Sequence, residues 1–230
     1  MIDGLLFDKD GTLFDFRVSW GRWASAFLSR IAQDAGHKAR LGRAIGFDPA
    51  TGSFAPDSPV IAATAADIAA ALAPELPGVS VADLREQIDA SAGQAPMSEA
   101  VPLLPLLSAL RAQGLRLGVA TNDSEIPARQ HLANHGITGC FDFIAGYDSG
   151  HGAKPGPGMC LAFAQQLGLE PSRVAMVGDS RHDLEAGRAA GMRTVAVLTG
   201  IAKRDELAPH ADVVLEDIGA IPGWLSGLQG

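Results

Sequence analysis

Residues 5–14 have the sequence LLFDKDGTLF, and the rest of the chain can be interpreted from this stretch. The apolar run that ends at Phe7 is short and precedes a turn signal, which predicts a buried strand. Asp8 and Asp10 follow two positions apart, so in an extended segment they point to the same side. Two neighbouring carboxylates repel each other and need a cation or a shared proton. Taken alone, a strand that ends in a polar turn with an Asp cap explains these residues equally well.

The composition bounds the class of protein. Hydrophobic residues make up 47% of the 230 residues and the formal net charge is −8. We therefore expect a sizeable core and no broad nucleic-acid surface, because no basic run is present to contact phosphates. The two cysteines, Cys140 and Cys160, show no metal-ligand spacing. With no secretory signal pattern and no apolar stretch of about 18 residues, we expect a cytoplasmic protein that does not bind membranes, as a monomer or homodimer.

Most of the chain alternates short apolar runs with helical patterns. Strands are expected at residues 2–7, 115–120, 141–145, 174–177, 194–198 and 213–215. Between them, helices are expected at residues 102–113, 125–135, 159–167 and 183–190. This alternation predicts an α/β fold with a Rossmann-like parallel sheet that is covered on both faces.

A long segment interrupts this alternation directly after the first strand. Helical periodicity occurs at residues 19–36, 38–45, 60–73 and 81–92, with a loop at 46–59. Trp20 and Trp23 lie on one apolar face, for which core packing is the favoured interpretation. We therefore expect an all-helical cap domain at residues 15–95, inserted into a core domain made of residues 1–14 and 96–230.

Polar side chains follow four of the expected strands. Ligands of open α/β sheets bind beyond the carboxyl ends of the strands, so we expect these side chains to converge on one rim. They are Asp8 and Asp10, Thr121 and Asn122, Lys154, and Asp179 with Asp183. Carboxylates are the hard oxygen ligands that suit Mg²⁺, and no His/Cys cluster suggests zinc.

These residue types indicate phosphoryl-transfer chemistry. An ionised Asp8 is able to attack phosphorus and form an aspartyl-phosphate. Asp10 is placed to protonate the leaving alcohol and later to deprotonate a water. The transferring group carries spread negative charge, which the Thr121 hydroxyl, Lys154 and Mg²⁺ would stabilise.

Four short motifs resemble those of the haloacid dehalogenase-like hydrolase superfamily. DKDGTLF at residues 8–14 is similar to its first motif and VATN at 119–122 to its second. Lys154 before Pro155 is similar to the third motif, and VGDS at 177–180 with Asp183 to the fourth. The inserted helices resemble the cap of the phosphoglycolate phosphatase-like branch.

The resemblance implies a role for each matching residue at the metal. Asp8 would be the nucleophile and Asp10 the acid–base residue. Asp8, the backbone carbonyl of Asp10, and Asp179 would bind Mg²⁺, with Thr12 beside them. The family's strand order would also place strands one and four side by side and so bring Asp8 and Asp179 together.

It also implies how phosphate is bound. Thr121, with Asn122 next to it, and Lys154 would bind the phosphoryl group. Asp183 would either hold a metal-bound water or orient Lys154. The expected enzyme is thus a Mg²⁺-dependent phosphatase that acts on a small phosphorylated metabolite, such as phosphoglycolate.

The inserted helices would set specificity, and Arg17 is the first candidate to bind a substrate carboxylate because it is nearest the hinge. Arg22, Lys38, Arg40 and Arg43 are further candidates. A sugar phosphomutase of the same superfamily shares all four motifs and stays an alternative. A haloacid dehalogenase would not need Asp10 or the Mg²⁺-binding carboxylates, and a non-enzymatic binding module would tolerate the loss of Asp8 or Asp10.

Overall fold

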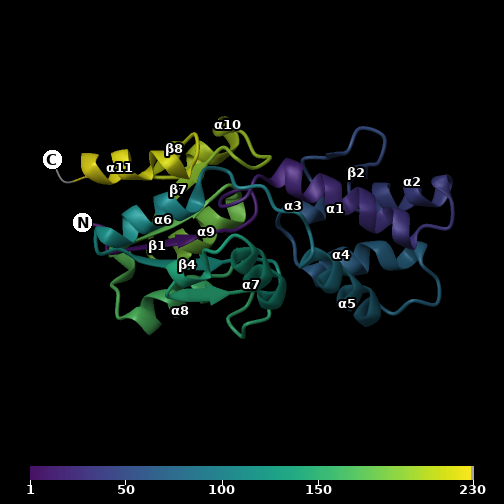
Figure 1. Cartoon of the computed structure of the whole chain (residues 1–230), viewed down its shortest axis with the longest axis horizontal. Helices are drawn as coiled ribbons and strands as arrows, with labels where there is room; N and C mark the ends of the chain where they lie inside the picture. Colours follow the sequence, from purple (N-terminus) through teal and green to yellow (C-terminus); the bar gives the residue numbers. More distant parts are fainter. Residues whose placement is uncertain (229–230) are drawn as a thin grey trace.

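The computed structural model describes residues 1–228 and contains a six-stranded parallel sheet (Figure 1). Its strand order is β5-β4-β1-β6-β7-β8. The strands are β1 (Gly4–Phe7), β4 (Arg116–Ala120), β5 (Phe143–Ala145), β6 (Val174–Gly178), β7 (Arg193–Val197) and β8 (Val213–Leu215). All neighbouring strands of this sheet run parallel. The predicted α/β core is therefore confirmed, including the edge strand β8.

Helices cover both faces of the sheet. They are α6 (Leu103–Ala112), α7 (Glu125–Asn134), α8 (Gly158–Leu167), α9 (Arg181–Ala189), α10 (Arg204–Leu207) and α11 (Ile221–Gly227). Because successive strand side chains alternate between faces, Leu5 and Phe7 pack with α6 and α11, whereas Leu6 packs with α8. Among residues 1–228, no helix combines the length and apolar character needed to cross a bilayer.

Residues 16–95, which we call the insertion, lie at the end of the molecule away from both termini (Figure 1). Its helices are α1 (Phe16–Ile31), α2 (Ala35–Ala44), α3 (Pro59–Ala62), α4 (Ala65–Leu72) and α5 (Val81–Ala92). They enclose an apolar cluster of their own, which includes Trp23, Phe27, Leu41 and Ile88. That the insertion is a separate domain with bounds 15–95 stays a prediction.

The insertion differs from the expected all-helical unit at one place. The segment expected as a loop at 46–59 forms an antiparallel ribbon of β2 (Phe47–Asp48) and β3 (Ser53–Phe54). The rings of Phe47 and Phe54 lie 4.9 Å apart across it. Strands of two residues are too short to produce a period-2 pattern, so the sequence offers no signal for them.

Polar capping side chains also shift helix boundaries from the positions that the apolar pattern predicts. The helix expected at 60–73 is divided, because Thr64 and Asp67 form a capping box that starts α4. The first helix begins earlier than expected, since the Asp15 carboxylate accepts a hydrogen bond of 2.9 Å from the Val18 backbone N–H. By contrast, α5 has the expected bounds, and the Ser80 side chain caps its start by accepting from the Asp83 backbone N–H.

Candidate active site

Pairing of β1 with β6 brings the first and last acidic motifs together. Phe7 lies beside Val177 in the sheet, and the Asp8 backbone N–H donates to the Val177 carbonyl at 2.8 Å. As a result, carboxylate oxygens of Asp8, Asp179 and Asp183 lie within 4.8 Å of one another. These residues line a pocket between the carboxyl ends of the strands and the insertion.

Lys154 is buried at the centre of this cluster. Its Nζ lies 2.6 Å from Oδ1 of Asp8, 2.6 Å from Oδ1 of Asp183 and 2.7 Å from the Ala120 carbonyl oxygen. Oδ2 of Asp183 accepts a further hydrogen bond of 2.7 Å from the Ser180 hydroxyl at the start of α9. Of the two roles expected for Asp183, this geometry favours orienting Lys154.

The buried charges shift the pKa values of these groups. Burial raises the pKa of Asp8 to about 7, against the lowering effect of Lys154. Burial, reinforced by Asp8 and Asp183, also raises the pKa of Asp179 well above its ordinary value. Burial alone would lower the pKa of Lys154, but Asp183 and Asp8 together raise it. Without a cation, the Asp8 and Asp179 carboxyl groups therefore tend to hold protons.

The same cluster fits a small divalent cation. Its donors are carboxylate oxygens, which Mg²⁺ prefers. Two glycines leave room for the Asp179 carboxylate. A Cβ at Gly200 would lie 1.7 Å from Oδ2 of Asp179, and a Cβ at Gly11 would lie 2.3 Å from the same atom. The Thr12 hydroxyl lies 3.4 Å from the other carboxylate oxygen of Asp179. Asp8 and Asp179 are thus the residues best placed to hold the ion.

Thr121 and Asn122, which follow β4, have different environments. The Thr121 hydroxyl accepts a hydrogen bond of 3.0 Å from the Asp123 backbone N–H, which leaves its proton to donate into the pocket. The Asn122 amide group donates to the Lys154 carbonyl at 2.9 Å and to the Ala62 carbonyl at 2.8 Å. Its oxygen accepts from the Lys154 backbone N–H at 2.8 Å.

The Asn122 side chain therefore uses both amide protons on protein partners. It holds the Lys154 loop and joins that loop to α3 of the insertion. This differs from the expected role in binding phosphate, because the sequence shows an amide beside the site but not where its hydrogen bonds go.

Asp10 has one carboxylate oxygen fixed by two donors. Oδ1 of Asp10 lies 2.7 Å from Nζ of Lys9 and 2.8 Å from Nε1 of Trp20 on α1. Trp20 packs in the apolar cluster of the insertion, as expected, and also lines the pocket. Asp10 is thus held from both the core and the insertion.

Lys9, which sequence reasoning passed over, is fully buried. Its Nζ lies 3.2 Å from Oδ2 of Asp123 and 3.1 Å from Nδ1 of His131. The other ring nitrogen of His131 lies 2.7 Å from the Ala92 carbonyl at the end of α5. This arrangement fits a neutral imidazole that donates from Nε2 and accepts from Lys9 at Nδ1.

The pKa shifts agree with this network. Burial, followed by the Lys9 charge, lowers the pKa of His131 to about 4. Burial raises the pKa of Asp123 to about 6, although Lys9 opposes the shift. The sequence did contain a signal for this buried position. Leu5, Phe7 and Lys9 are each two residues apart, so the Lys9 side chain is expected on the same buried side as the other two.

Two residues of the predicted site, Arg17 and Thr12, do not line the pocket; Thr12 lies against Asp179, whereas Arg17 makes no such contact with the site. The Arg17 side chain is exposed at the start of α1, and it is absent from the residues that line the pocket. Nearness to the hinge in sequence did not determine the direction in which this side chain points.

Comparison with known proteins gives the family. The model of the haloacid dehalogenase-like hydrolases matches residues 2–191. The chain is 36% identical over 122 residues to a phosphoglycolate phosphatase of Rhodospirillum rubrum, covering 53% of this chain and 51% of that protein. It is 42% identical over 119 residues to the tyrosine-protein kinase PtkA of Mycobacterium tuberculosis, covering 51% of this chain and 40% of that protein. The chain thus spans about half the length of the curated relatives it matches.

Similarity of fold extends over nearly the whole chain. A crystal structure of a predicted phosphoglycolate phosphatase from Haemophilus somnus aligns with a TM-score of 0.74 at 20% identity. That alignment covers 97% of this chain and 98% of the other. The family model and the four motifs, now seen around one pocket, lead to the same assignment. The chain belongs to the haloacid dehalogenase-like hydrolase family.

Proposed function

We propose that the protein is a Mg²⁺-dependent phosphatase that hydrolyses small phosphomonoesters through an aspartyl-phosphate on Asp8. The observation that carries the proposal is the position of Asp8 beside Lys154 in the pocket that Asp10 also lines. The relative from Rhodospirillum rubrum, named a phosphoglycolate phosphatase, supports the reaction class. Bound at Asp8 and Asp179, Mg²⁺ would neutralise charge on the carboxylates and on the phosphoryl oxygens.

In the first step, a carboxylate oxygen of Asp8 attacks phosphorus and the bond between phosphorus and the ester oxygen breaks. Lys154 donates to Oδ1 of Asp8 at 2.6 Å, which fixes the carboxylate. Protonated Asp10 gives its proton to the departing alkoxide and becomes a carboxylate. The Thr121 hydroxyl is placed to donate to a phosphoryl oxygen.

In the second step, water attacks the phosphorus of the aspartyl-phosphate. The Asp10 carboxylate accepts a proton from that water, inorganic phosphate departs, and Asp8 returns to its carboxylate form. Trp20 and Lys9 hold Asp10 through both steps by hydrogen bonds to Oδ1, so Oδ2 is the oxygen left to exchange the proton.

Transfer to a sugar, as in a phosphomutase, or to a polypeptide is the alternative fate of the phosphoryl group. The pocket lies beneath the insertion and is lined on that side by apolar residues. This setting suits a small ester and a water molecule better than a polypeptide acceptor or a sugar with many hydroxyl groups. It therefore supports hydrolysis.

The test is hydrolysis of p-nitrophenyl phosphate by the wild-type protein with Mg²⁺ and with EDTA. We expect turnover that requires Mg²⁺ and that falls by at least about 10³-fold in Asp8→Asn, because the amide is not a nucleophile. Asp205→Asn, at an exposed position on α10, is the matched control and should keep wild-type activity. Full activity of Asp8→Asn would overturn the proposal.

A further inference from the structure

The two sides of the pocket differ sharply in chemistry. Of the described residues, the core contributes only polar or charged ones, among them the five carboxylates of Asp8, Asp10, Asp123, Asp179 and Asp183. The others are Lys154, His182, Thr121, Asn122 and Ser180. Every described residue that the insertion contributes is Trp, Val, Ile or Ala, with Trp20, Trp23, Val60, Ile61, Ile68 and Ile88 the largest. The phosphoryl end of a substrate would face the core, so its organic end faces this apolar wall.

The polar side-chain atoms of the wall, and one of its backbone carbonyls, are engaged elsewhere. Nε1 of Trp20 donates to Asp10 at 2.8 Å, and Nε1 of Trp23 donates to the Ser91 hydroxyl at 2.9 Å. The Ala62 carbonyl accepts from the Asn122 amide at 2.8 Å. The side chains of the wall therefore present ring and alkyl surface to the substrate, which stabilises apolar groups by removing them from water.

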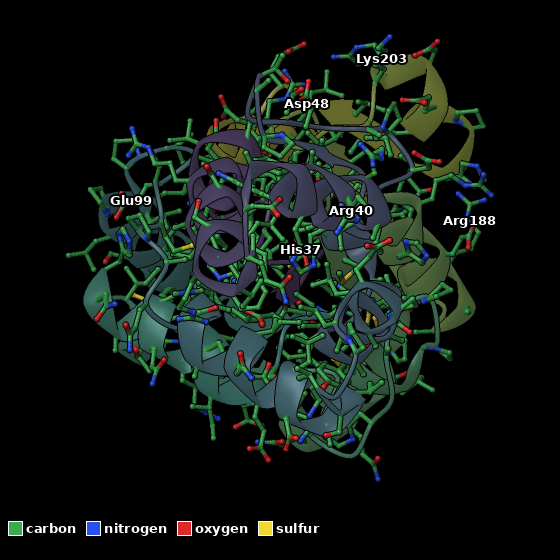
Figure 2. All side chains as sticks on the ribbon, turned by 90° about the vertical axis from the view of Figure 1, so that its right-hand side faces the viewer. His37, Arg40, Asp48, Glu99, Arg188 and Lys203 are labelled. Carbon is green, nitrogen blue, oxygen red and sulfur yellow. The ribbon has the colours of Figure 1, made fainter. Side chains whose placement is uncertain are left out.

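The cations expected to bind a substrate carboxylate are not on this wall. Arg40 pairs with Glu75 at 3.0 Å, and Lys38 on the same helix donates to the Ser25 hydroxyl at 3.3 Å. Helix α2, which carries both, lies at the end of the insertion farthest from the sheet (Figure 1). Figure 2 looks onto that end, where Arg40 is labelled. Arg17 and Arg22 are exposed and lie outside the pocket.

A second anionic group on the substrate would therefore meet no lysine or arginine among the described residues on the side of the pocket that the insertion forms. Among residues 1–228, Lys154 is the only lysine or arginine that lines the pocket, and it is paired with Asp8 and Asp183. His182 at the start of α9 also lines the pocket, on the side that the core forms. A carboxylate placed against the wall would lose its hydration without gaining a partner, which is strongly unfavourable for a charged group.

We propose that the substrate is a phosphomonoester of an uncharged, predominantly apolar alcohol or phenol, selected by the wall that Trp20, Trp23, Val60, Ile61, Ile68 and Ile88 form. This inference rests on the proposed phosphatase function and narrows its substrate class. Two features of the wall would discriminate between substrates: it offers no partner to an organic anion, and it makes apolar contacts with an uncharged group. This replaces the expectation that Arg17 recognises a substrate carboxylate.

The test compares phenyl phosphate with 4-carboxyphenyl phosphate, using the wild-type protein with Mg²⁺. The two esters have the same shape apart from the carboxylate, which also makes its phenolate the slightly better leaving group. Chemical reactivity therefore favours the charged ester, and a preference for the neutral one must come from the pocket. We expect kcat/KM for phenyl phosphate to be higher by at least about tenfold, mainly through KM, and 2-phosphoglycolate to be a poor substrate.

Ile61→Arg provides the complementary change, because Ile61 lines the pocket from α3 and is only half-buried. This substitution should lower KM for 4-carboxyphenyl phosphate. The ratio of kcat/KM for phenyl phosphate to kcat/KM for 4-carboxyphenyl phosphate should therefore fall by at least about threefold. Leu104→Arg, at an exposed position on α6, is the matched control and should keep the wild-type ratio.

The outcomes separate this inference from the function on which it rests. Equal use of both esters by the wild-type protein, or a preference for the carboxylated ester or for 2-phosphoglycolate, overturns the inference and leaves the phosphatase proposal standing. A folded Ile61→Arg variant with an unchanged ratio contradicts the assignment of the wall. Failure to hydrolyse any of these esters would instead remove the phosphatase proposal, and the inference with it.

Discussion

Nε1 of Trp20 lies 2.8 Å from Oδ1 of Asp10, so a helix of the insertion is hydrogen-bonded to the proposed acid–base residue of the core. The same indole packs at 5.1 Å against Trp23 inside the insertion. The position of the Asp10 carboxylate therefore depends on the insertion lying over the pocket.

Trp20→Phe should impair proton transfer while keeping an apolar ring in the wall. A hydrogen bond to a charged group contributes about 1.5–3 kcal/mol, so we expect kcat for an alkyl phosphate to fall by about tenfold or more. p-Nitrophenolate leaves without protonation, so kcat for p-nitrophenyl phosphate should fall much less. Steady-state kinetics on both esters measures the difference.

Trp224→Phe is the control, since Trp224 packs against the sheet cluster remote from Asp10. Equal loss of kcat on the alkyl and the aryl ester in Trp20→Phe would show that this hydrogen bond does not serve the acid–base step.

Lys9→Met should destabilise the fold. The Lys9 ammonium is fully buried with Asp10 at 2.7 Å and Asp123 at 3.2 Å, and its removal leaves both carboxylates without their cation. Breaking a buried ion pair in this way costs about 3–5 kcal/mol in the free energy of unfolding. Urea denaturation at neutral pH measures it.

Lys203→Met is the matched control, because Lys203 is exposed at the periphery of the molecule (Figure 2). It should change the free energy of unfolding by less than about 0.5 kcal/mol. In the double variant Lys9→Met/Asp123→Asn, part of the loss should be recovered because one unpaired charge is gone. A Lys9→Met protein as stable as wild type would contradict the role given to this ion cluster.

The principal features of the core were predictable from sequence because they depend on local patterns. Short apolar runs that each end in a polar residue predicted the parallel sheet. The adjacency of β1 and β6, which brings Asp8 to Asp179, was implied by the family resemblance and not by a local pattern. The two-residue ribbon and the division of the 60–73 helix were not predictable from periodicity, since pair contacts and the Thr64 cap decide them.

The site was less predictable wherever the direction of a side chain decides its role. Asn122 has the expected place, but its amide holds Lys154 and Ala62. Trp20 has the spacing of a core residue and is one, yet its N–H reaches Asp10. Arg17 was chosen for its nearness to the hinge, and sequence distance carries no information on orientation. Lys9 acquires its partners only when α7 and the end of α5 pack beside β1.

His131 should make the protein less stable in acid. Its pKa is about 4 in the folded protein against 6.5 for an ordinary histidine. As the pH falls below 6.5, the unfolded state takes up a proton that the folded state does not, so stability is lost down to the folded pKa. The full contribution is about 3 kcal/mol.

His131→Gln removes this contribution while Asp8, Asp123 and Asp179 titrate in both proteins. The free energy of unfolding of the variant should therefore fall less than that of wild type between about pH 7.5 and about pH 4.5. Parallel pH profiles for the two proteins would show that His131 is not held neutral.

Mg²⁺ should stabilise the protein more at high pH than at low pH. The raised pKa values of Asp8 and Asp179 mean that the folded, metal-free site keeps protons that unfolded carboxyls release. This contribution to stability is present at low pH and lost as the pH rises through about 7. Metal ligands must be deprotonated, so protons compete with Mg²⁺ below that value.

The increase in Tm on adding saturating Mg²⁺ should therefore be larger at about pH 8 than at about pH 5.5. Asp179→Asn should lose most of the increase at about pH 8, because it removes a proposed ligand. An increase of equal size at both pH values would contradict the assignment of the cation to these buried carboxylates.

The nucleophilic role of Asp8 is tested most directly by trapping the phosphoenzyme. Asp10→Asn should still accept a phosphoryl group from p-nitrophenyl phosphate, whose leaving group needs no proton, but should lack the base that activates water. Acid quenching followed by peptide mass spectrometry is expected to find the phosphoryl group on the peptide that contains Asp8, with none in Asp8→Asn. Release of p-nitrophenol with no phosphorylated peptide, or phosphorylation at another residue, would contradict the proposed mechanism.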